Sequence, residues 1–145
     1  MAAADWECTV AIVDDDAVFR RALQRLVRSA GFEAQAFATG ADFLEAAAQR
    51  PPDCVLLDLQ MPGLDGFEVQ VRMERDGLHV PVVVITGSDT PDGEERAKRG
   101  GASAYLRKPV DSEAVIEAIR ASVGSTQRGS DGQTRPGSPS GPGRI

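Results

Sequence analysis

The sequence predicts an α/β fold in which five parallel strands, each followed by a helix, form a doubly wound sheet between two helical layers. Short apolar runs bounded by turn residues recur along the chain, as expected of strands buried on both faces of a parallel sheet. Segments with helical spacing lie between these runs, and parallel strands need such crossover connections. At 145 residues the chain is long enough for one domain with a hydrophobic core.

The first half of the chain supplies two strands and two helices of this pattern. Residues 9–13 are a short apolar strand, and apolar residues then fall on one face of a helix between positions 19 and 30. Gly31 is a typical stop for that helix. Residues 33–37 alternate in polarity, as in a less buried strand, and Thr39 is the expected N-cap of a helix that continues to about residue 49.

The third strand and the segment after it are predicted on different grounds. Residues 54–57 are all apolar and lead directly to Asp58, which is followed by a turn. Residues 66–75 alternate between apolar and polar side chains, a pattern that favours a strand. We nevertheless predict a helix there, because the segment connects two buried strands and a parallel connection is usually helical.

The last part of the chain continues the same alternation. Residues 80–86 are a buried strand, with Pro81 tolerable near its start. Pro91 suits the first turn of a helix that is capped by Asp89 or Thr90 and stopped by Gly100 and Gly101. A fifth strand over residues 102–107 precedes a final helix, which is capped by Asp111 or Ser112.

Charge and composition exclude several classes of protein. The chain is 41% hydrophobic and 26% charged, as in globular domains. Its formal net charge is −6, and residues 124–145 contribute +2, which leaves −8 on residues 1–123. This balance argues against direct binding of nucleic acid, which requires a basic face. It is compatible with an acidic pocket that binds a cation.

The two ends of the chain differ from its middle. Residues 1–8 form a short N-terminal extension without the features of a signal peptide, and no apolar run approaches the roughly 20 residues of a membrane span. We therefore expect a cytoplasmic protein with no membrane contact, in which Cys8 and Cys54 are reduced. Thirteen of the last 22 residues are Gly, Pro or Ser. We predict a folded domain over residues 9–123 and a disordered tail over residues 124–145.

Polar side chains follow four of the five predicted strands: Asp14, Asp15 and Asp16 after the first, Asp58 after the third, Thr86 at the end of the fourth, and Lys108 after the fifth. In open α/β sheets the loops beyond these strand ends form the ligand crevice. Clustered carboxylates need a cation nearby, and a set of oxygen ligands suits Mg²⁺. An aspartate can itself attack phosphorus, while a lysine and a hydroxyl can bind the other phosphoryl oxygens.

The ordered set of these residues resembles the receiver domain of response regulators in two-component systems: Asp14 and Asp15, Asp58, Thr86, Tyr105, and Lys108 with Pro109. The resemblance covers about residues 9–123. It implies a flavodoxin-like, three-layer (βα)₅ fold with strand order 2-1-3-4-5. The tail contains no helix-turn-helix pattern, so the chain is either a stand-alone receiver or a piece of a longer regulator.

The resemblance also implies a role for each residue of the acidic site. Asp58 would accept a phosphoryl group from a phosphohistidine on a sensor histidine kinase or a histidine phosphotransfer protein. Asp14 and Asp15 would hold Mg²⁺ together with Asp58 and the backbone carbonyl of Gln60. Lys108 would pair with the phosphoryl group, next to a cis peptide bond to Pro109. Such a receiver is not an enzyme beyond Mg²⁺-dependent self-phosphorylation and autodephosphorylation.

The same resemblance implies a switch and a readout surface. Thr86 would bond a phosphoryl oxygen, and Tyr105 would turn inward as Thr86 moves. The fourth helix, fifth strand and fifth helix would then signal to a downstream protein target, with a phosphorylation-dependent homodimer as one form of output. Gly87 leaves the space beside Thr86 open. Gln60, two residues past the acceptor, is a less usual residue at a position that the family links to acyl-phosphate lifetime.

Two other functions use the same residues. Residues 14–18 match the D-x-D-x-[TV] motif of haloacid-dehalogenase-like phosphohydrolases, in which Asp14 would be the nucleophile. That family also needs an acidic pair after the lysine, and here only Asp111 follows Lys108 closely. The third possibility is a receiver-like adaptor that never accepts phosphate, although every position that phosphorylation needs is filled.

Overall fold

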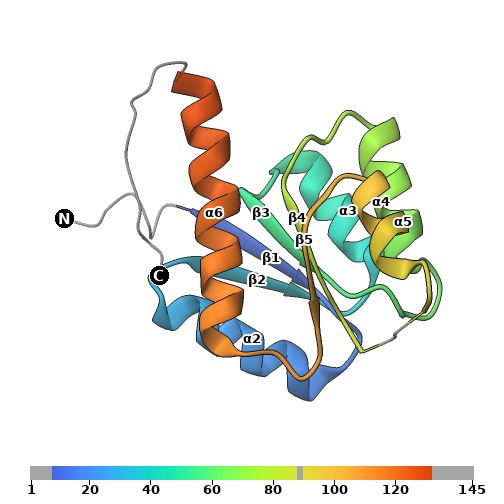
Figure 1. The fold of residues 1–145 in the computed structure, drawn as a ribbon. Helices are drawn as coiled ribbons and strands as arrows, with labels where there is room; N and C mark the ends of the chain where they lie inside the picture. The colour runs from blue at the N-terminus through green and yellow to red at the C-terminus, as the bar shows by residue number, and fades with distance from the viewer. Residues whose placement is uncertain (1–7, 88–89, 132–145) are drawn as a thin grey trace.

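The computed structural model describes residues 8–87 and 90–131, which form a single five-stranded parallel sheet between two helical layers (Figure 1). The strands are β1 (Thr9–Val13), β2 (Glu33–Phe37), β3 (Cys54–Leu57), β4 (Val82–Thr86) and β5 (Ala102–Arg107). The helices are α2 (Ala17–Ser29), α3 (Gly40–Gln49), α4 (Gly66–Arg75), α5 (Gly93–Arg99) and α6 (Ser112–Asp131). The strand order β2-β1-β3-β4-β5 and the doubly wound α/β/α arrangement confirm the predicted fold class.

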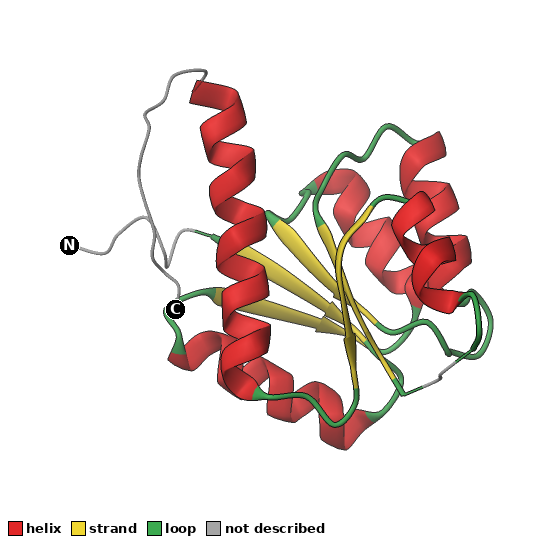
Figure 2. Ribbon diagram, viewed as in Figure 1, coloured by secondary structure: helices red, strands yellow, loops and turns green. Residues whose placement is uncertain are grey.

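Each face of the sheet is covered by its own group of helices (Figure 2). Val10 and Ile12 of β1 lie in the core beneath α2 and α6, and Ala11 and Val13 lie in the core beneath α3, α4 and α5. This division follows from the alternation of side chains along a strand. The central strands β1, β3 and β4 are almost entirely buried, which explains why their sequences are continuous apolar runs.

The helix over residues 66–75 is confirmed despite its strand-like alternation. Asp65 begins it with a capping box: its carboxylate accepts the N–H of Glu68, and the Glu68 side chain accepts the N–H of Asp65. Only some of the alternating apolar residues are buried in the core: Val69 is buried, whereas Val71 is 65% exposed. The cap and the helical spacing of the buried residues therefore outweigh the alternation.

Two predicted boundaries in the second half of the chain were wrong. The helix expected to start at Asp89 or Thr90 begins only at Gly93, and Asp92 stands at its N-cap without a side-chain hydrogen bond. Pro91 therefore precedes the helix instead of lying in its first turn. Strand β4 begins at Val82, one residue after Pro81, because proline has no N–H to donate to the neighbouring strand.

The C-terminal helix is longer than predicted. It continues to Asp131, so residues 124–131 are helical where a disordered tail was expected to begin. The remainder of that expected tail, and residues 1–7, lie outside the described residues. Cys8 and Cys54 are buried free thiols, and burial raises the pKa of the Cys54 thiol to about 12. Within the described part of the chain, no helix is long and apolar enough to cross a membrane.

The loop after β3 is held close to α4 by a glycine. The N–H of Gly66 donates to the Leu59 carbonyl across 2.9 Å. A Cβ on Gly66 would stand 2.5 Å from the Asp58 carbonyl oxygen and 2.8 Å from Leu59 Cα. Because both neighbours are backbone atoms, α4 can approach the end of β3 this closely only if residue 66 has no side chain.

We predict that Gly66→Ala lowers the free energy of unfolding by about 1–3 kcal/mol, because the added methyl must displace the backbone that carries Asp58. Urea unfolding followed by circular dichroism measures this change. Gly87→Ala is the matched control, since a Cβ there would meet only the flexible Lys108 side chain, at 3.7 Å. Equal unfolding midpoints for the two variants would contradict the close packing of α4 on the β3 loop.

Candidate functional site

Backbone pairing brings the polar ends of the central strands together. Val13 pairs with Leu57 between β1 and β3, so that Asp14 and Asp58 follow neighbouring positions in the register. The N–H of Asp58 donates to the Val13 carbonyl across 3.0 Å, and the N–H of Lys108 donates to the Thr86 carbonyl across 2.9 Å. The sheet therefore places the predicted residues of four chain segments at one edge, as the sequence indicated.

The Lys108 ammonium joins the two buried carboxylates of this edge. Its Nζ lies 2.9 Å from Asp14 Oδ2 and 3.6 Å from Asp58 Oδ2. Asp14 is only 2% exposed and Asp58 only 5%. The Phe19 ring, at the start of α2, lies beneath the same ammonium, with its centroid 4.3 Å from Nζ. Lys108 is also joined to Pro109 by a cis peptide bond, as the family resemblance implied.

Asp14 is held in place by several further contacts. Its Oδ1 accepts the N–H of Asp16 across 2.9 Å, and its backbone carbonyl accepts a hydrogen bond from the Arg20 guanidinium across 2.8 Å. Asp16 itself caps α2, accepting the N–H groups of Val18 and Phe19. The position of Asp14 is thus fixed both by β1 and by the first turn of α2.

Asp14, Asp15 and Asp58 form a group that could hold a metal ion. Each offers one carboxylate oxygen, and these three oxygens lie within 4.8 Å of one another. Asp14 and Asp58 are buried, whereas Asp15 is exposed. Oxygen donors at this spacing, open to solvent on one side, are the ligands that Mg²⁺ prefers. The residues present therefore fit the metal that the sequence predicted.

The pKa of Asp58 is shifted by its burial and by the charges around it. Burial raises the pKa of the Asp58 carboxyl above its ordinary value, and the nearby Asp14 carboxylate raises it further. Lys108, the Gln60 backbone N–H and the Thr86 hydroxyl lower the pKa, but they do not reverse the shift. The site thus disfavours the charge on Asp58 unless additional positive charge is supplied.

The pKa of Lys108 is also raised, and for a base this favours the charged form. Burial lowers the pKa of the Lys108 ammonium. The hydrogen bond to Asp14 and the charges of Asp58, Asp14 and Asp16 raise it, and the net result is a pKa above the ordinary value. Lys108 is therefore a permanent cation at neutral pH.

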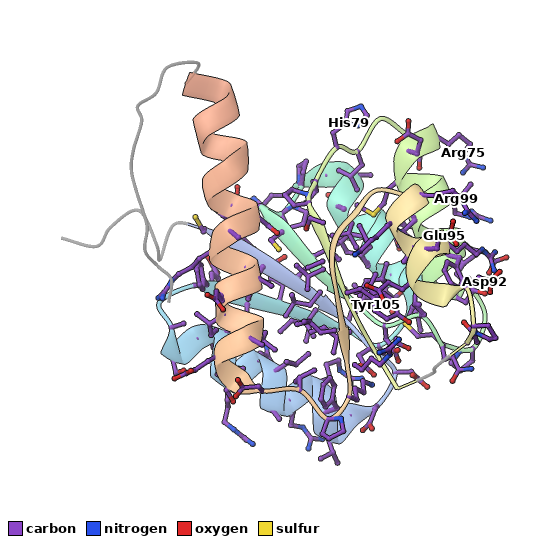
Figure 3. The ribbon with its side chains drawn as sticks, viewed as in Figure 1. Arg75, His79, Asp92, Glu95, Arg99 and Tyr105 are labelled. Carbon is purple, nitrogen blue, oxygen red and sulfur yellow. The ribbon has the colours of Figure 1, made fainter. Side chains whose placement is uncertain are left out.

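Thr86 and Tyr105 occupy neighbouring strands beside this cluster. Thr86 is fully buried at the end of β4, where its hydroxyl bonds the Asp58 carboxylate. Tyr105 lies on β5 with its hydroxyl directed at the start of α5, where a Cβ on Gly93 would stand 3.3 Å from it (Figure 3). Gly87 borders the Lys108 side chain. These placements agree with the positions that the sequence suggested.

The profile of the response regulator receiver domain matches residues 10–120 of the chain. The chain belongs to the response-regulator receiver family. Receiver domains belong to two-component systems of the bacterial type, they bind Mg²⁺ in an acidic pocket, and they interact with histidine kinases and downstream effectors. The family is one of signalling domains rather than of ordinary enzymes.

Curated relatives of this receiver include complete regulators and single domains. The transcriptional regulatory protein FixJ of Azorhizobium caulinodans is 37% identical over 116 residues, which cover 79% of this chain and 54% of FixJ. The polar-differentiation response regulator DivK of Brucella ovis is 31% identical over 118 residues, which cover 80% of this chain and 96% of DivK. Nodulation protein W of Bradyrhizobium diazoefficiens is also matched over only 54% of its length, so the chain spans about half of some relatives.

Solved structures show the same fold. A response regulator receiver protein from Burkholderia phymatum is 44% identical, with a TM-score of 0.71 over 81% of this chain and 95% of that protein. The chemotaxis protein CheY4 of Vibrio cholerae is 27% identical, with a TM-score of 0.72 over 79% of this chain and 98% of CheY4.

Two neighbours of the receiver site, Phe19 and Arg20, were not recognised from sequence as part of it. Phe19 was expected only on the apolar face of its helix, and no role in the site was predicted for Arg20. Gln60 was expected to contribute its carbonyl, but its N–H also bonds Asp58 Oδ1, across 3.4 Å. Phe19 and Arg20 stand three and four residues after Asp16, the last residue of the acidic run, and this closeness in sequence was the available signal.

We predict that Asp58→Asn raises the free energy of unfolding at pH 7 without divalent metal. The folded-state pKa of Asp58 lies above its unfolded value, so ionisation costs the folded protein more than the unfolded chain. The advantage of the variant should therefore be absent below the unfolded pKa, grow as the pH rises from that value to the folded-state pKa, and be complete above the folded-state pKa. Urea unfolding between pH 3 and pH 8 measures it.

Asp92→Asn provides the control for this pH series, because Asp92 is exposed and its side chain makes no capping hydrogen bond. If Asp58→Asn were less stable than the unmodified protein at pH 7, the assignment of a disfavoured charge to Asp58 would be incorrect.

Proposed function

We propose that this receiver accepts a phosphoryl group on Asp58 from a phosphohistidine of a sensor histidine kinase or a histidine phosphotransfer protein. The observation that carries the proposal is the position of Asp58. Its carboxylate stands at the end of β3 within one group of Asp14, Asp15 and Lys108. Both the charge needed to attract a cation and the charge needed to bind a phosphoryl oxygen are therefore already in place.

The transfer exchanges one bond to phosphorus for another. A carboxylate oxygen of Asp58 attacks the phosphorus, an O–P bond forms, and the P–N bond to the donor imidazole breaks. The imidazole leaves with the electron pair and takes up a proton from solvent. Mg²⁺, when bound, neutralises charge on the phosphoryl oxygens and the attacking carboxylate. We assign its ligands as Asp14, Asp15, Asp58 and the backbone carbonyl of Gln60.

Lys108 and Thr86 hold the phosphoryl group after transfer. The Lys108 ammonium lies 3.6 Å from Asp58 and is a permanent cation, so it pairs with one phosphoryl oxygen. The Thr86 hydroxyl already bonds the Asp58 carboxylate and moves to donate to another phosphoryl oxygen. Tyr105 follows this movement, because its hydroxyl and α5 share the adjacent space. Two populations then exist, and phosphorylation shifts the balance between them.

The readout of the switch is assigned to α5, β5 and α6. Tyr105 belongs to β5, its hydroxyl lies at the start of α5, and α6 packs against β5 from the other face of the sheet. These elements would present a different surface to a downstream protein target or to a second copy of the chain. FixJ is named a transcriptional regulatory protein and DivK a polar-differentiation response regulator. The described residues contain no DNA-reading element beyond the receiver, so we assign no direct nucleic-acid contact to them.

The phosphohydrolase with Asp14 as nucleophile is disfavoured by the contacts of Asp14. One of its carboxylate oxygens accepts the N–H of Asp16 and the other lies 2.9 Å from Lys108 Nζ, and the residue is 2% exposed. Asp58 has the longer contact to Lys108, at 3.6 Å. In an adaptor that never accepts phosphate, this group of carboxylates around Lys108 would have no role.

We predict that the protein, incubated with Mg²⁺ and a small phosphodonor, gains one phosphoryl group of 80 Da that is stable in acid and labile in base, as an acyl phosphate is. Intact-protein mass spectrometry measures the gain, and peptide mapping after borohydride reduction locates it on Asp58. Asp58→Asn should abolish the label, and removing Mg²⁺ should reduce it by at least about tenfold.

Asp65→Asn is the matched control in this labelling, because Asp65 is a carboxylate of the same loop that only caps α4. A label on Asp14 would support the phosphohydrolase chemistry instead. No label on any residue, with Mg²⁺ bound, would support the adaptor.

A further inference from the structure

Helix α5 is weakly attached to the domain by apolar contacts. It has seven residues, of which only Gly93 and Ala97 are buried, and Asp92 gives it no side-chain cap. Its ion pairs lie on the surface, including Lys98 with Glu94 at 3.2 Å and Arg99 with Glu95 at 3.1 Å (Figure 3). Exposed pairs of this kind add little stability. Other contacts must therefore fix the position of α5.

The C-terminal end of α5 is capped by a side chain from α4. The last carbonyls of a helix lack partners within the helix. Here the N–H groups of Gly100 and Gly101 satisfy the carbonyls of Arg96 and Lys98, each across 3.0 Å. The Ala97 carbonyl instead accepts a hydrogen bond from Gln70 Nε2, across 2.9 Å. Gln70 is 27 residues away in sequence and only 4% exposed.

The surroundings of Gln70 are closely fitted. A Cβ on Gly100 would stand 3.1 Å from Cδ, Nε2 and Oε1 of Gln70, so the glycine makes room for the amide. Gln70 Oε1 is buried and accepts no hydrogen bond from any residue that the structure describes. One helical turn away, the Arg96 guanidinium stacks 3.9 Å above the Phe67 ring. Residues 67 and 70 of α4 therefore hold the second half of α5.

The N-terminal end of α5 is built differently. A Cβ on Gly93 would overlap the Thr90 hydroxyl and would stand 3.3 Å from the Tyr105 hydroxyl. This end of the helix therefore touches Tyr105, which lies on the strand next to that of Thr86, and no side chain caps it. One end of α5 is anchored on α4, and the other end rests on the residue assigned to the switch.

We propose that Gln70 is the positioning residue of α5, and that α5 rocks about this C-terminal anchor when Asp58 is phosphorylated. The inference rests on the proposed function for the source of the movement, but the anchor itself exists in the unphosphorylated protein. Gln70 touches neither the phosphoryl group nor the metal ligands. Gln70 acts through α5, because its hydrogen bond to the Ala97 carbonyl holds the C-terminal end of the helix and leaves the N-terminal end to follow Tyr105.

The anchor is tested first without phosphorylation, by amide hydrogen exchange measured by NMR. In Gln70→Met, a side chain of similar size leaves the Ala97 carbonyl buried and unpaired. The hydrogen-bonded amides from Ala97 to Gly101 should then exchange about tenfold faster. Gly100→Ala keeps Gln70 but crowds its amide, so it should accelerate the same amides by a smaller factor. Arg99→Ala, which removes only an exposed ion pair, is the control.

The rocking movement is tested with beryllofluoride and Mg²⁺, a stable mimic of the phosphorylated aspartate. In the unmodified protein, amide chemical shifts should change strongly over residues 93–95 and little over residues 98–101. In Gln70→Met the changes should spread to both ends. A merely structural role would destabilise α5 without altering this distribution.

The two proposals fail in different ways. Unchanged exchange at residues 97–101 in both Gln70→Met and Gly100→Ala would overturn the anchor. Equal shift changes at the two ends of α5 in the unmodified protein would overturn the rocking movement. If beryllofluoride changed no shifts near Asp58, the proposed phosphorylation would fail, while the exchange data would still decide whether Gln70 anchors α5.

Discussion

The arrangement of this site depends on one ammonium shared between two buried carboxylates. Lys108 Nζ lies 2.9 Å from Asp14 and 3.6 Å from Asp58, and the exposed Asp15 lies beside them. Burial and then the nearby Asp14 carboxylate raise the pKa of Asp58, and the single positive charge of Lys108 does not offset them. A divalent cation would relieve this excess of negative charge, and it could then also bind the negatively charged oxygens of a phosphoryl group. The site therefore favours a ligand that carries positive charge.

The sheet brings the charged groups of the site together, and we assign the response to phosphorylation to helix α5. Asp14 and Asp58 are fixed by strand pairing, and Gly66 lets α4 press against the backbone that carries Asp58. Helix α5 has little apolar burial and is positioned by a polar contact from Gln70 at one end and by Tyr105 at the other. A change at Thr86 can reach the surface through such an element at low energetic cost.

The sequence allowed the sheet and the acidic site to be predicted, because both depend on local patterns. Apolar runs that end in Asp14, Asp58 and Thr86 identify buried strands and their carboxyl ends together. The predicted start of α5 was wrong, because Thr90 and Pro91 resemble the start of a helix but belong to a turn that precedes it. Gln70 could not be recognised, because a polar residue in an alternating segment suggests an exposed position. Its burial results from packing against α5, which lies 27 residues further along the chain.

The effect of Mg²⁺ on thermal stability shows whether Asp58 belongs to a cation site. The melting temperature of the unmodified protein and of Asp58→Asn is measured at pH 7 as Mg²⁺ is titrated from zero to several millimolar. The unmodified protein should gain stability with rising Mg²⁺, and Asp58→Asn should gain much less because one ligand and one charge are missing. An equal gain in both proteins, or no gain in either, would contradict a cation site built on Asp58.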